Sequence, residues 1–272
     1  VLTIIVSYNF VPWADRCLGS LRASTMHTDV MVIDNDSQDY TVDYVRQHYP
    51  EACVVANDAN LGFGQANNIG MSKALSEGYD AVFLLNQDAW VAPDAIALLA
   101  AESERHGEGG IFSPIHLDGT WKALDFGFAE YTGLRSTADI PQTGSVEVPF
   151  VNAAFWFIPT ETLRRVGGFS PLFYHYGEDT DYVNRLHRCS LTVRYVPAAR
   201  ACHDRQQRHT TRAMQLRAER VWHLSEYANP CHSICRAFAM GVLAAAKKGL
   251  RDLALMRIAL DTLMLTPSVL RH

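Results

Sequence analysis

The sequence predicts an α/β fold with a mostly parallel central sheet flanked by helices. Short apolar runs rich in β-branched residues alternate with amphipathic helical patterns, as they do in βαβ units. Hydrophobic residues make up 48% and charged residues 19% of the 272 residues, so the chain can bury a substantial core. No internal repeat or low-complexity tract interrupts the alternation. We therefore expect one α/β domain with an appended helical segment.

The first half of the domain, residues 1–115, alternates strands and helices. The predicted strands are Leu2–Val6, Val30–Ile33, Cys53–Ala56 and Ala81–Leu85, and the predicted helices are Trp13–Ser24, Thr41–His48 and Gly64–Glu77. Pro93 is expected at the first position of the next helix, because its fixed φ suits that position. Ile96, Leu98 and Leu99 of this helix would then cover the sheet.

The second half, residues 116–209, starts less regularly, with glycines and aromatic residues separating short extended pieces. Its predicted elements are a buried strand over Phe150–Ile158, a helix over Thr160–Val166 that ends at Gly167-Gly168, a helix from Glu178 to about Cys189, and a strand over Thr192–Val196. The remaining residues, 210–272, form the predicted C-terminal extension. Its helices are expected near Met214–Tyr227, His232–Lys248 and Asp252–Leu265.

Charge and cysteine content narrow the class of protein. A formal charge of −5 and a pI near 6.1 argue against nucleic-acid binding as the main activity. Six cysteines scattered along the chain indicate reduced thiols in a cytoplasmic protein. The apolar run 237–246 is too short to span a membrane and is followed by Lys247 and Lys248. Peripheral contact with the inner face of the plasma membrane therefore stays open, as does self-association.

Polar side chains follow three of the predicted strands, at Ser7, Asp34 and Asp88. Ligands of open α/β sheets gather at the carboxyl ends of strands, so we expect these side chains to converge. Asp34 either accepts hydrogen bonds from a ribose or a base, or stabilises an ordinary turn. Asn86 and Asp88 share one face of an extended chain, and carboxylate oxygen suits Mg²⁺ or Mn²⁺. His203 is the best protein candidate for a further metal ligand.

Further polar and aromatic residues are candidates for chemistry or binding. Glu178 and Asp179 begin a predicted helix, where a carboxylate either serves as a general base or stabilises the helix start. The residues Arg205, Arg208, His209, Arg212, Arg217 and Arg220 would either bind a diphosphate or a lipid-linked anionic acceptor, or form a solvated helix face. Trp156 is either an acceptor platform or, more in keeping with its neighbours, a core residue.

These motifs together resemble the family 2 glycosyltransferases, especially the bacterial rhamnosyltransferase-like and galactofuranosyltransferase-like branch. The resemblance covers about residues 2–204. It is carried by Ile5-Val6-Ser7-Tyr8-Asn9, Asp34-Asn35-Asp36-Ser37, the segment from Asn60 to Gly70, Leu85-Asn86-Gln87-Asp88, Gly167-Gly168-Phe169, Gly177-Glu178-Asp179 and His203. Two positions depart from the family pattern: Asn86 replaces the first acid of the usual Asp-x-Asp, and Ser170 stands where an aspartate is frequent.

The resemblance implies a GT-A fold, a nucleoside-diphosphate sugar donor, a divalent metal such as Mg²⁺ or Mn²⁺, and inversion by direct displacement. Residues 1–115 would bind the nucleotide sugar, and residues 116–209 would bind a glycan or lipid-linked acceptor. The implied donor-binding residues are Ser7, Asn9, Asp34, Asn67, Asn86 and Asp88. Asp88 and His203 would hold the metal. Asp179 would be the base that deprotonates the acceptor hydroxyl, with Glu178 as the second choice.

Two other functions stay open at this stage. A non-catalytic protein that binds nucleotide sugars would share the same pocket but show no turnover. A sugar nucleotidyltransferase would share the α/β start, yet it should carry a glycine-rich, basic loop after the first strand. The loop here is Tyr8-Asn9-Phe10-Val11-Pro12, which has neither property.

Overall fold

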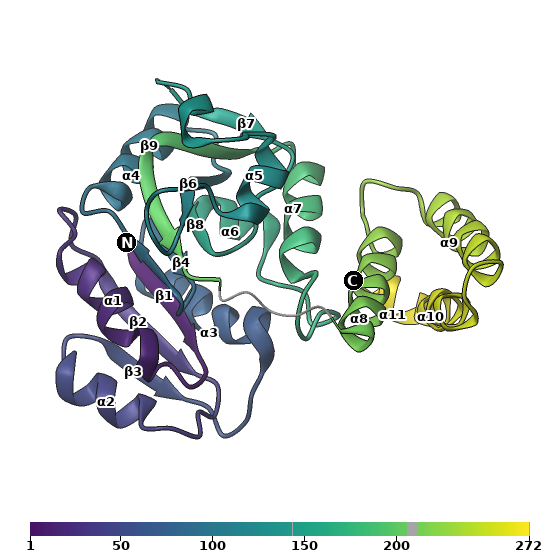
Figure 1. Cartoon of the computed structure of the whole chain (residues 1–272), viewed down its shortest axis with the longest axis horizontal. Coiled ribbons are helices and arrows are strands. Elements are labelled where there is room, and N and C mark those ends of the chain that lie inside the picture. Colours follow the sequence, from purple (N-terminus) through teal and green to yellow (C-terminus); the bar gives the residue numbers. More distant parts are fainter. Residues whose placement is uncertain (143, 206–210, 272) are drawn as a thin grey trace.

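A central sheet of nine strands, counted over residues 1–142, 144–205 and 211–271 that the computed structural model describes, forms the middle layer of the protein (Figure 1). The strands are β1 (Leu2–Ser7), β2 (Asp29–Asp34), β3 (Cys53–Ala56), β4 (Ala81–Leu85), β5 (Ala89–Val91), β6 (Ile111–Asp118), β7 (Val146–Val148), β8 (Phe155–Pro159) and β9 (Val193–His203). Their order is β3-β2-β1-β4-β8-β6-β9-β5, with β7 beside β9.

The sheet is parallel on one side and mixed on the other. Strands β3, β2, β1 and β4 run parallel, as the alternating pattern of the sequence predicts. Strand β8 is antiparallel to both β4 and β6, and β9 is parallel to β6 but antiparallel to β5 and β7. The predicted α/β fold with a central sheet flanked by helices is confirmed.

Helices cover both faces of the sheet, so its central strands are buried on both sides (Figure 1). Within the domain they are α1 (Val11–Arg22), α2 (Thr41–His48), α3 (Gly62–Glu77), α4 (Ala95–His106), α5 (Phe126–Thr132), α6 (Thr160–Val166) and α7 (Glu178–Arg188). In β4, Val82 and Leu84 face one hydrophobic core, and Phe83 and Leu85 face the other. Full burial of such a side chain contributes about 1.5–3 kcal/mol, which accounts for the continuous apolar run in this strand.

Several predicted element boundaries differ from the structure by one or more residues, and three of these differences change how an element is described. Helix α4 begins at Ala95 with Asp94 as its N-cap, so Pro93 precedes the helix, and the carbonyl of Pro93 accepts a hydrogen bond from the N–H of Thr25 at 2.8 Å. Strand β8 begins at Phe155 and not at residue 150. Strand β9 does not end at residue 196 but continues to residue 203.

Strand β9 continues past Pro197 because a bulge absorbs the proline. Pro197 has no N–H to give to a regular ladder. The register between β6 and β9 shifts between Pro114 and Ile115, from Pro114 opposite Val196 to Ile115 opposite Arg200. The expected loop is therefore a bulge within one long strand, and the strand carries its last residues back to the edge of the sheet.

The C-terminal helices are α8 (Arg212–Tyr227), α9 (Ile234–Gly249), α10 (Leu253–Leu263) and α11 (Thr266–Val269), and they form a separate group beside α7 (Figure 1). A small cluster joins them to the domain: Phe173 packs with Tyr227, Ala237 and Val269. The predicted boundary between residues 209 and 210 lies outside the described residues, so the division into domain and extension stays a prediction. No described helix combines the length and hydropathy needed to cross a membrane.

Asn68 of α3 fixes the loop that follows α6. Its side chain accepts a hydrogen bond from the N–H of Phe169 at 2.7 Å and donates one to the carbonyl of Phe169 at 2.9 Å. We predict that Asn68→Ala lowers the free energy of unfolding by about 1–3 kcal/mol, because the backbone of Phe169 loses both partners. Urea denaturation measures the change. The control is Ser72→Ala, an exposed position of the same helix, and equal stabilities of the two variants would contradict the prediction.

Candidate active site

Ser7 and Asp34 meet at the carboxyl ends of neighbouring strands, as predicted. They are register partners in β1 and β2, and the hydroxyl of Ser7 donates to Oδ1 of Asp34 at 2.9 Å. The N–H of Ser37 donates to Oδ2 of Asp34 at 2.9 Å, and the Ser37 hydroxyl donates to Oδ1 at 2.5 Å. Asp34 is buried, so its carboxylate holds the β2–α2 loop in place whether or not it also contacts a ligand.

Asn9 and Gln87 make hydrogen bonds that join the loops after β1, β2 and β4. Asn9 adopts a positive φ of 54°, its N–H donates to the Ser37 hydroxyl at 2.8 Å, and its side-chain oxygen accepts from the N–H of Gln38 at 2.9 Å. The Gln87 amide pairs with both backbone groups of Tyr8, at 2.7 Å to the N–H and 3.1 Å to the carbonyl. Gln87 was not among the predicted site residues, although it lies between Asn86 and Asp88, which were.

Asn86, Asp88 and His203 form a compact cluster where β4 turns into β5. Oδ1 of Asp88 lies 3.3 Å from Nε2 of His203, and Nδ2 of Asn86 lies 3.4 Å from the same nitrogen. His203 is the last residue of β9 and is the register partner of Ala89. The His203 side chain is 5% exposed and the Asp88 side chain 22% exposed, so the pair opens towards solvent on the Asp88 side.

The distance between these two groups fits a shared divalent ion. Neighbouring ligands of an octahedral ion at 2.0–2.1 Å lie about 3.0 Å apart. The 3.3 Å between Asp88 and His203 is close to that value. Among the described residues, no group of three His, Cys, Asp or Glu side chains is arranged to hold a metal. A metal held by this pair would therefore need its remaining ligands from a bound diphosphate and water.

Arg205 lies on the other side of His203. Its Nε donates to Nδ1 of His203 at 3.2 Å and lies 3.0 Å from Oδ2 of Asp125. Asp125 also caps α5 by accepting from the N–H of Phe128 at 3.0 Å. Sequence reasoning named Arg205 as a candidate diphosphate ligand but missed Asp125, whose position before a short helix was the available signal.

The remaining described members of the basic stretch lie on α8. Arg212, Arg217 and Arg220 are exposed on α8, which fits the solvated-face interpretation. Arg208 and His209 lie outside the described residues.

Glu178 and Asp179 occupy the first turn of α7, and burial changes the proton affinity of both. The N-cap is Gly177, at φ 84°. Glu178 is 7% exposed, its Oε2 has no hydrogen-bond partner among the described residues, and burial together with the charge of Asp179 raises its pKa to about 8. Burial also raises the pKa of Asp179, and hydrogen bonds from the N–H groups of Thr180 and Ala153 partly offset that rise.

The carboxylate pair is connected to the strand-end cluster. Ala153 contacts Asp179, and the carbonyl of the next residue, Ala154, accepts a hydrogen bond from the N–H of Asn86 at 3.0 Å. Tyr131 of α5 lies within electrostatic range of Asp179: burial raises the pKa of the Tyr131 phenol, and the charge of Asp179 raises it further. No motif of the sequence marks Tyr131 as a candidate.

Two predicted residues lie away from any open surface. Asn67 is 1% exposed and donates to the carbonyl of Phe63, one turn earlier in α3, at 3.0 Å. This position leaves Asn67 little surface with which to line a donor pocket. Trp156 is fully buried and donates to the carbonyl of Val151 at 3.2 Å, so the core interpretation is confirmed and the acceptor-platform interpretation is wrong.

The fold is the GT-A fold of glycosyltransferases. The structure resembles GalNAc-T7 solved with UDP, GalNAc and Mn²⁺, with a TM-score of 0.64 over 96% of this chain and 54% of that chain at 16% identity. It also resembles Staphylococcus aureus TarS, with a TM-score of 0.62 over 89% of this chain and 42% of that chain at 13% identity. The chain spans about half the length of these two proteins, and at these identities the likeness concerns the fold alone.

The family model described as glycosyl transferase family 2 matches residues 3–129. The chain is similar to the N-acetylglucosaminyl-diphospho-decaprenol L-rhamnosyltransferase of Mycobacterium tuberculosis, at 24% identity over 74% of this chain and 75% of the relative. It is also similar to rhamnosyltransferase WbbL of Escherichia coli K12, at 26% identity over 82% of this chain and 89% of the relative. Residues 3–129 therefore carry a glycosyl transferase family 2 domain, as the motifs predicted, and the chain is a glycosyltransferase.

The raised pKa of Glu178 makes stability depend on pH. The folded protein keeps a proton on Glu178 from pH 4.5 to about 8, a range in which the unfolded chain has lost it, so the free energy of unfolding falls as pH rises through that range. We predict that Glu178→Gln removes this dependence and exceeds the wild type in stability by on the order of 3 kcal/mol at pH 7. The difference in stability between Glu178→Gln and the wild type becomes smaller towards pH 5.

Urea denaturation across this pH range checks the prediction. Glu104→Gln, at an exposed position, is the control and should follow the wild type. Parallel pH profiles for wild type and Glu178→Gln would show that Glu178 is ionised in the folded protein.

Proposed function

We propose that this protein transfers a sugar from a nucleoside-diphosphate sugar, dTDP-rhamnose or a UDP-sugar, to a hydroxyl of a glycan or lipid-linked acceptor with inversion. The observation that carries the proposal is the meeting of three groups around Ala153 and Ala154. These groups are the Asp88–His203 pair, its neighbour Asn86, and Asp179. Both relatives are named rhamnosyltransferases, and the name of the Mycobacterium tuberculosis relative includes a decaprenol diphosphate, which supports the donor and acceptor classes.

Asp88 and His203 are the residues that would hold a divalent ion. Such an ion, Mg²⁺ or Mn²⁺, would neutralise the charge that grows on the leaving diphosphate. His203 presents a free electron pair at Nε2 only when its proton is on Nδ1. Arg205 now donates to Nδ1, so this tautomer requires Arg205 to move away. To pair with an anionic diphosphate, Arg205 would also have to leave Asp125, whose Oδ2 lies 3.0 Å from its Nε.

Asp179 is the proposed base. The acceptor oxygen forms a bond to the anomeric carbon as the bond to the diphosphate breaks, and the hydroxyl proton passes to the Asp179 carboxylate. A base works best when its pKa approaches the working pH, and burial moves the pKa of Asp179 in that direction. Glu178, with a pKa of about 8, holds its own proton at pH 7 and is a poorer acceptor.

A donor screen tests the nucleotide. We expect one class among UDP-, dTDP- and GDP-sugars to raise the melting temperature in the presence of Mn²⁺ or Mg²⁺ and to lose the effect with a chelator. A ligand at about 100 times its Kd stabilises the folded state by about 2.7 kcal/mol, which thermal shift resolves. Asp88→Asn should bind the same nucleotide without a response to metal. The donor proposal fails if no nucleotide changes the melting temperature.

Asp179→Asn separates catalysis from binding. We expect kcat to fall by roughly 10²–10⁴-fold while the donor-induced thermal shift is retained, because the variant keeps the shape of Asp179 but cannot take a proton. The control is Asp94→Asn, at an exposed position before α4, which should keep full activity. Full activity of Asp179→Asn together with loss of activity in Glu178→Gln would move the base to Glu178. Binding without turnover in the wild type would indicate a non-catalytic nucleotide-sugar-binding protein.

A further inference from the structure

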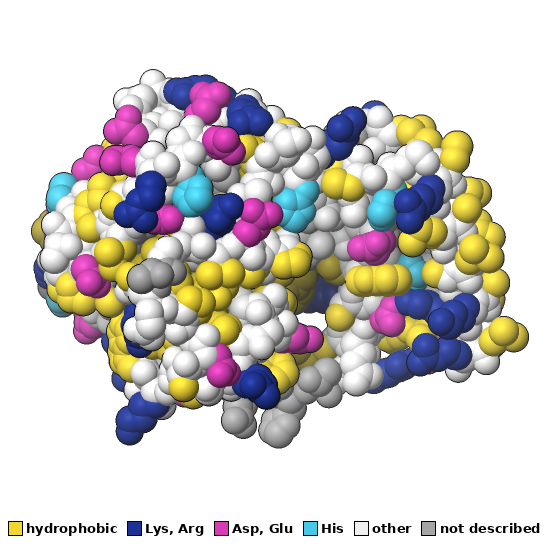
Figure 2. Space-filling model, turned by 90° about the horizontal axis from the view of Figure 1, so that it is seen from above, with side chains coloured by type: hydrophobic (Ala, Val, Ile, Leu, Met, Phe, Trp, Pro, Cys, Tyr) yellow, Lys and Arg dark blue, Asp and Glu magenta, His cyan; other side chains and the backbone are white. Residues whose placement is uncertain are grey.

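The extension exposes an unusual share of the apolar surface. Twelve of the twenty large hydrophobic side chains that are exposed among the described residues lie in residues 211–271. On α9, Phe238 and Val242 lie one turn apart on the exposed face, with Leu243 beside them. Leu250 in the α9–α10 turn is 92% exposed and Leu253 at the start of α10 is 72% exposed. Figure 2 shows apolar side chains along the outer edge of the extension, with Lys and Arg beside them.

The charge of the extension is opposite to that of the domain. Residues 211–272 contain nine Lys and Arg against four Asp and Glu, a net charge of +5, whereas residues 1–210 contain 15 against 25, a net charge of −10. Lys247 and Arg251 flank the most exposed leucine, Leu250. Apolar side chains mixed with basic ones are typical of surfaces that lie in the interface of an anionic membrane.

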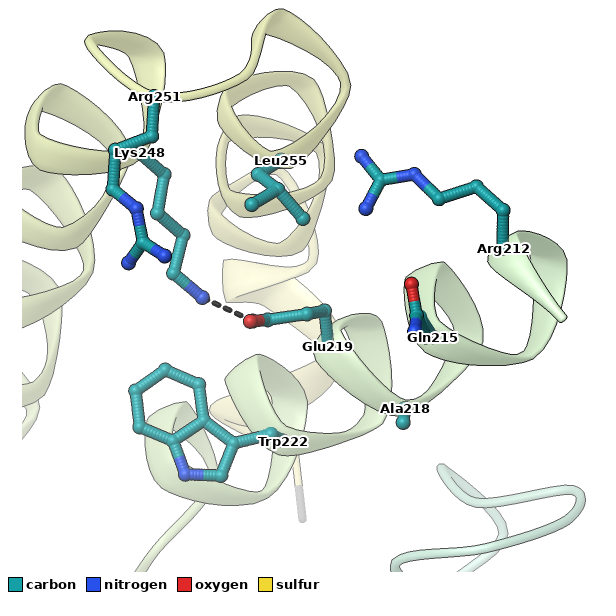
Figure 3. Close-up of a pocket in the computed structure, with 8 residues that line it drawn as sticks. All are labelled: Arg212, Gln215, Ala218, Glu219, Trp222, Lys248, Arg251 and Leu255. Atoms are coloured by element: carbon teal, nitrogen blue, oxygen red, sulfur yellow. Dashed lines mark hydrogen bonds and ion pairs between the residues drawn. The ribbon is translucent and has the colours of Figure 1, made fainter. Parts of the chain in front are cut away.

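A hollow of about 650 Å³ in the extension adds to this basic surface (Figure 3). Arg212, Lys248 and Arg251 line it, with Trp222 and Leu255 supplying apolar walls. Lys248 pairs with Glu219 and lies over the Trp222 ring, 4.7 Å from its centroid. Arg212 pairs in turn with Asp252, so a phosphate in the hollow would compete with Asp252 and Glu219 for two of the three cations beside the indole.

We propose that the outer edge of the extension docks on an anionic membrane. The docking face consists of Phe238, Val242, Leu243, Leu250 and Leu253, with Lys247 and Arg251 paired to lipid phosphates. A second copy of the chain is a poorer occupant, because it would bring two extensions of charge +5 together and because lysine is depleted in protein interfaces. The proposal goes beyond the transfer reaction and places its site beside a lipid surface.

Vesicle flotation tests the proposal without donor or acceptor, so its outcome does not depend on the donor screen. We expect the 272-residue chain to float with vesicles of phosphatidylcholine and phosphatidylglycerol at roughly 3:1 about tenfold more than with phosphatidylcholine alone. Roughly 0.5 M NaCl should reduce that preference, because salt screens the charges. Equal or absent binding to the two kinds of vesicle overturns the proposal.

Two double variants test whether vesicle binding depends on the docking face. Leu250→Ser with Leu253→Ser should lower the vesicle partition coefficient by about tenfold or more, as should Lys247→Glu with Arg251→Glu. The matched controls on the domain are Tyr40→Ser, at an 80% exposed side chain, and Arg46→Glu, at an exposed position of α2. An unchanged melting temperature confirms that each variant folds.

If the wild type binds vesicles and both paired variants bind them equally well, the assignment of the face is overturned. Light scattering tests the alternative that the face joins two copies of the chain. A dimer that Leu250→Ser dissociates, in a chain that binds no vesicle, overturns the membrane proposal and assigns the face to self-association.

Discussion

The register between β5 and β9 is the constraint on which the candidate site depends. Ala89 lies opposite His203, and the N–H of Asp204 donates to the carbonyl of Asp88 at 2.8 Å. These backbone contacts bring a carboxylate from the first half of the domain within 3.3 Å of an imidazole more than a hundred residues later in the chain. This register depends on the bulge near Pro197. Without the shift, the residues of β9 after the bulge, including His203, would point to the opposite face of the sheet.

Two buried carboxyl groups near this edge differ in their hydrogen-bond partners. Asp34 is buried but accepts three hydrogen bonds, from Ser7 and Ser37. Glu178 is buried with one oxygen unpaired among the described residues, and its pKa rises to about 8. Asp34 therefore serves to hold the β2–α2 loop through its hydrogen bonds, whereas burial without a partner for Oε2 raises the pKa of Glu178.

Much of the fold follows from local pattern. The predicted bounds of α2, β3, β4 and α6 match the structure residue for residue, because a turn, a proline or a glycine marks at least one end of each. The apolar run Ala81–Leu85 predicts a strand that is buried on both faces of the sheet, as β4 is. Strand β9 was predicted too short, because Pro197 signals a break and only the pairing with β6 shows that a bulge accommodates it.

The candidate site was predictable where strand ends converge and not where side chains cross between loops. The contact between Ser7 and Asp34 follows from topology, since parallel strands end at one edge. Gln87 contacts Tyr8 across 79 positions of the chain, and no local pattern encodes that pairing. Asn67 illustrates the converse: its segment contacts the loop after α6 through the neighbouring Asn68, and the one-residue difference in helical phase buries Asn67 instead.

The extension packs against Gly177, the residue that precedes Glu178 and the proposed base Asp179. A Cβ added to Gly177 would lie 2.5 Å from Cγ1 of Val221 in α8 and 3.0 Å from the Phe173 ring. Helix α8 therefore packs against the backbone from which α7 begins. A surface that holds α8–α10 against a membrane would also fix the orientation of the α7 N-terminus relative to that membrane.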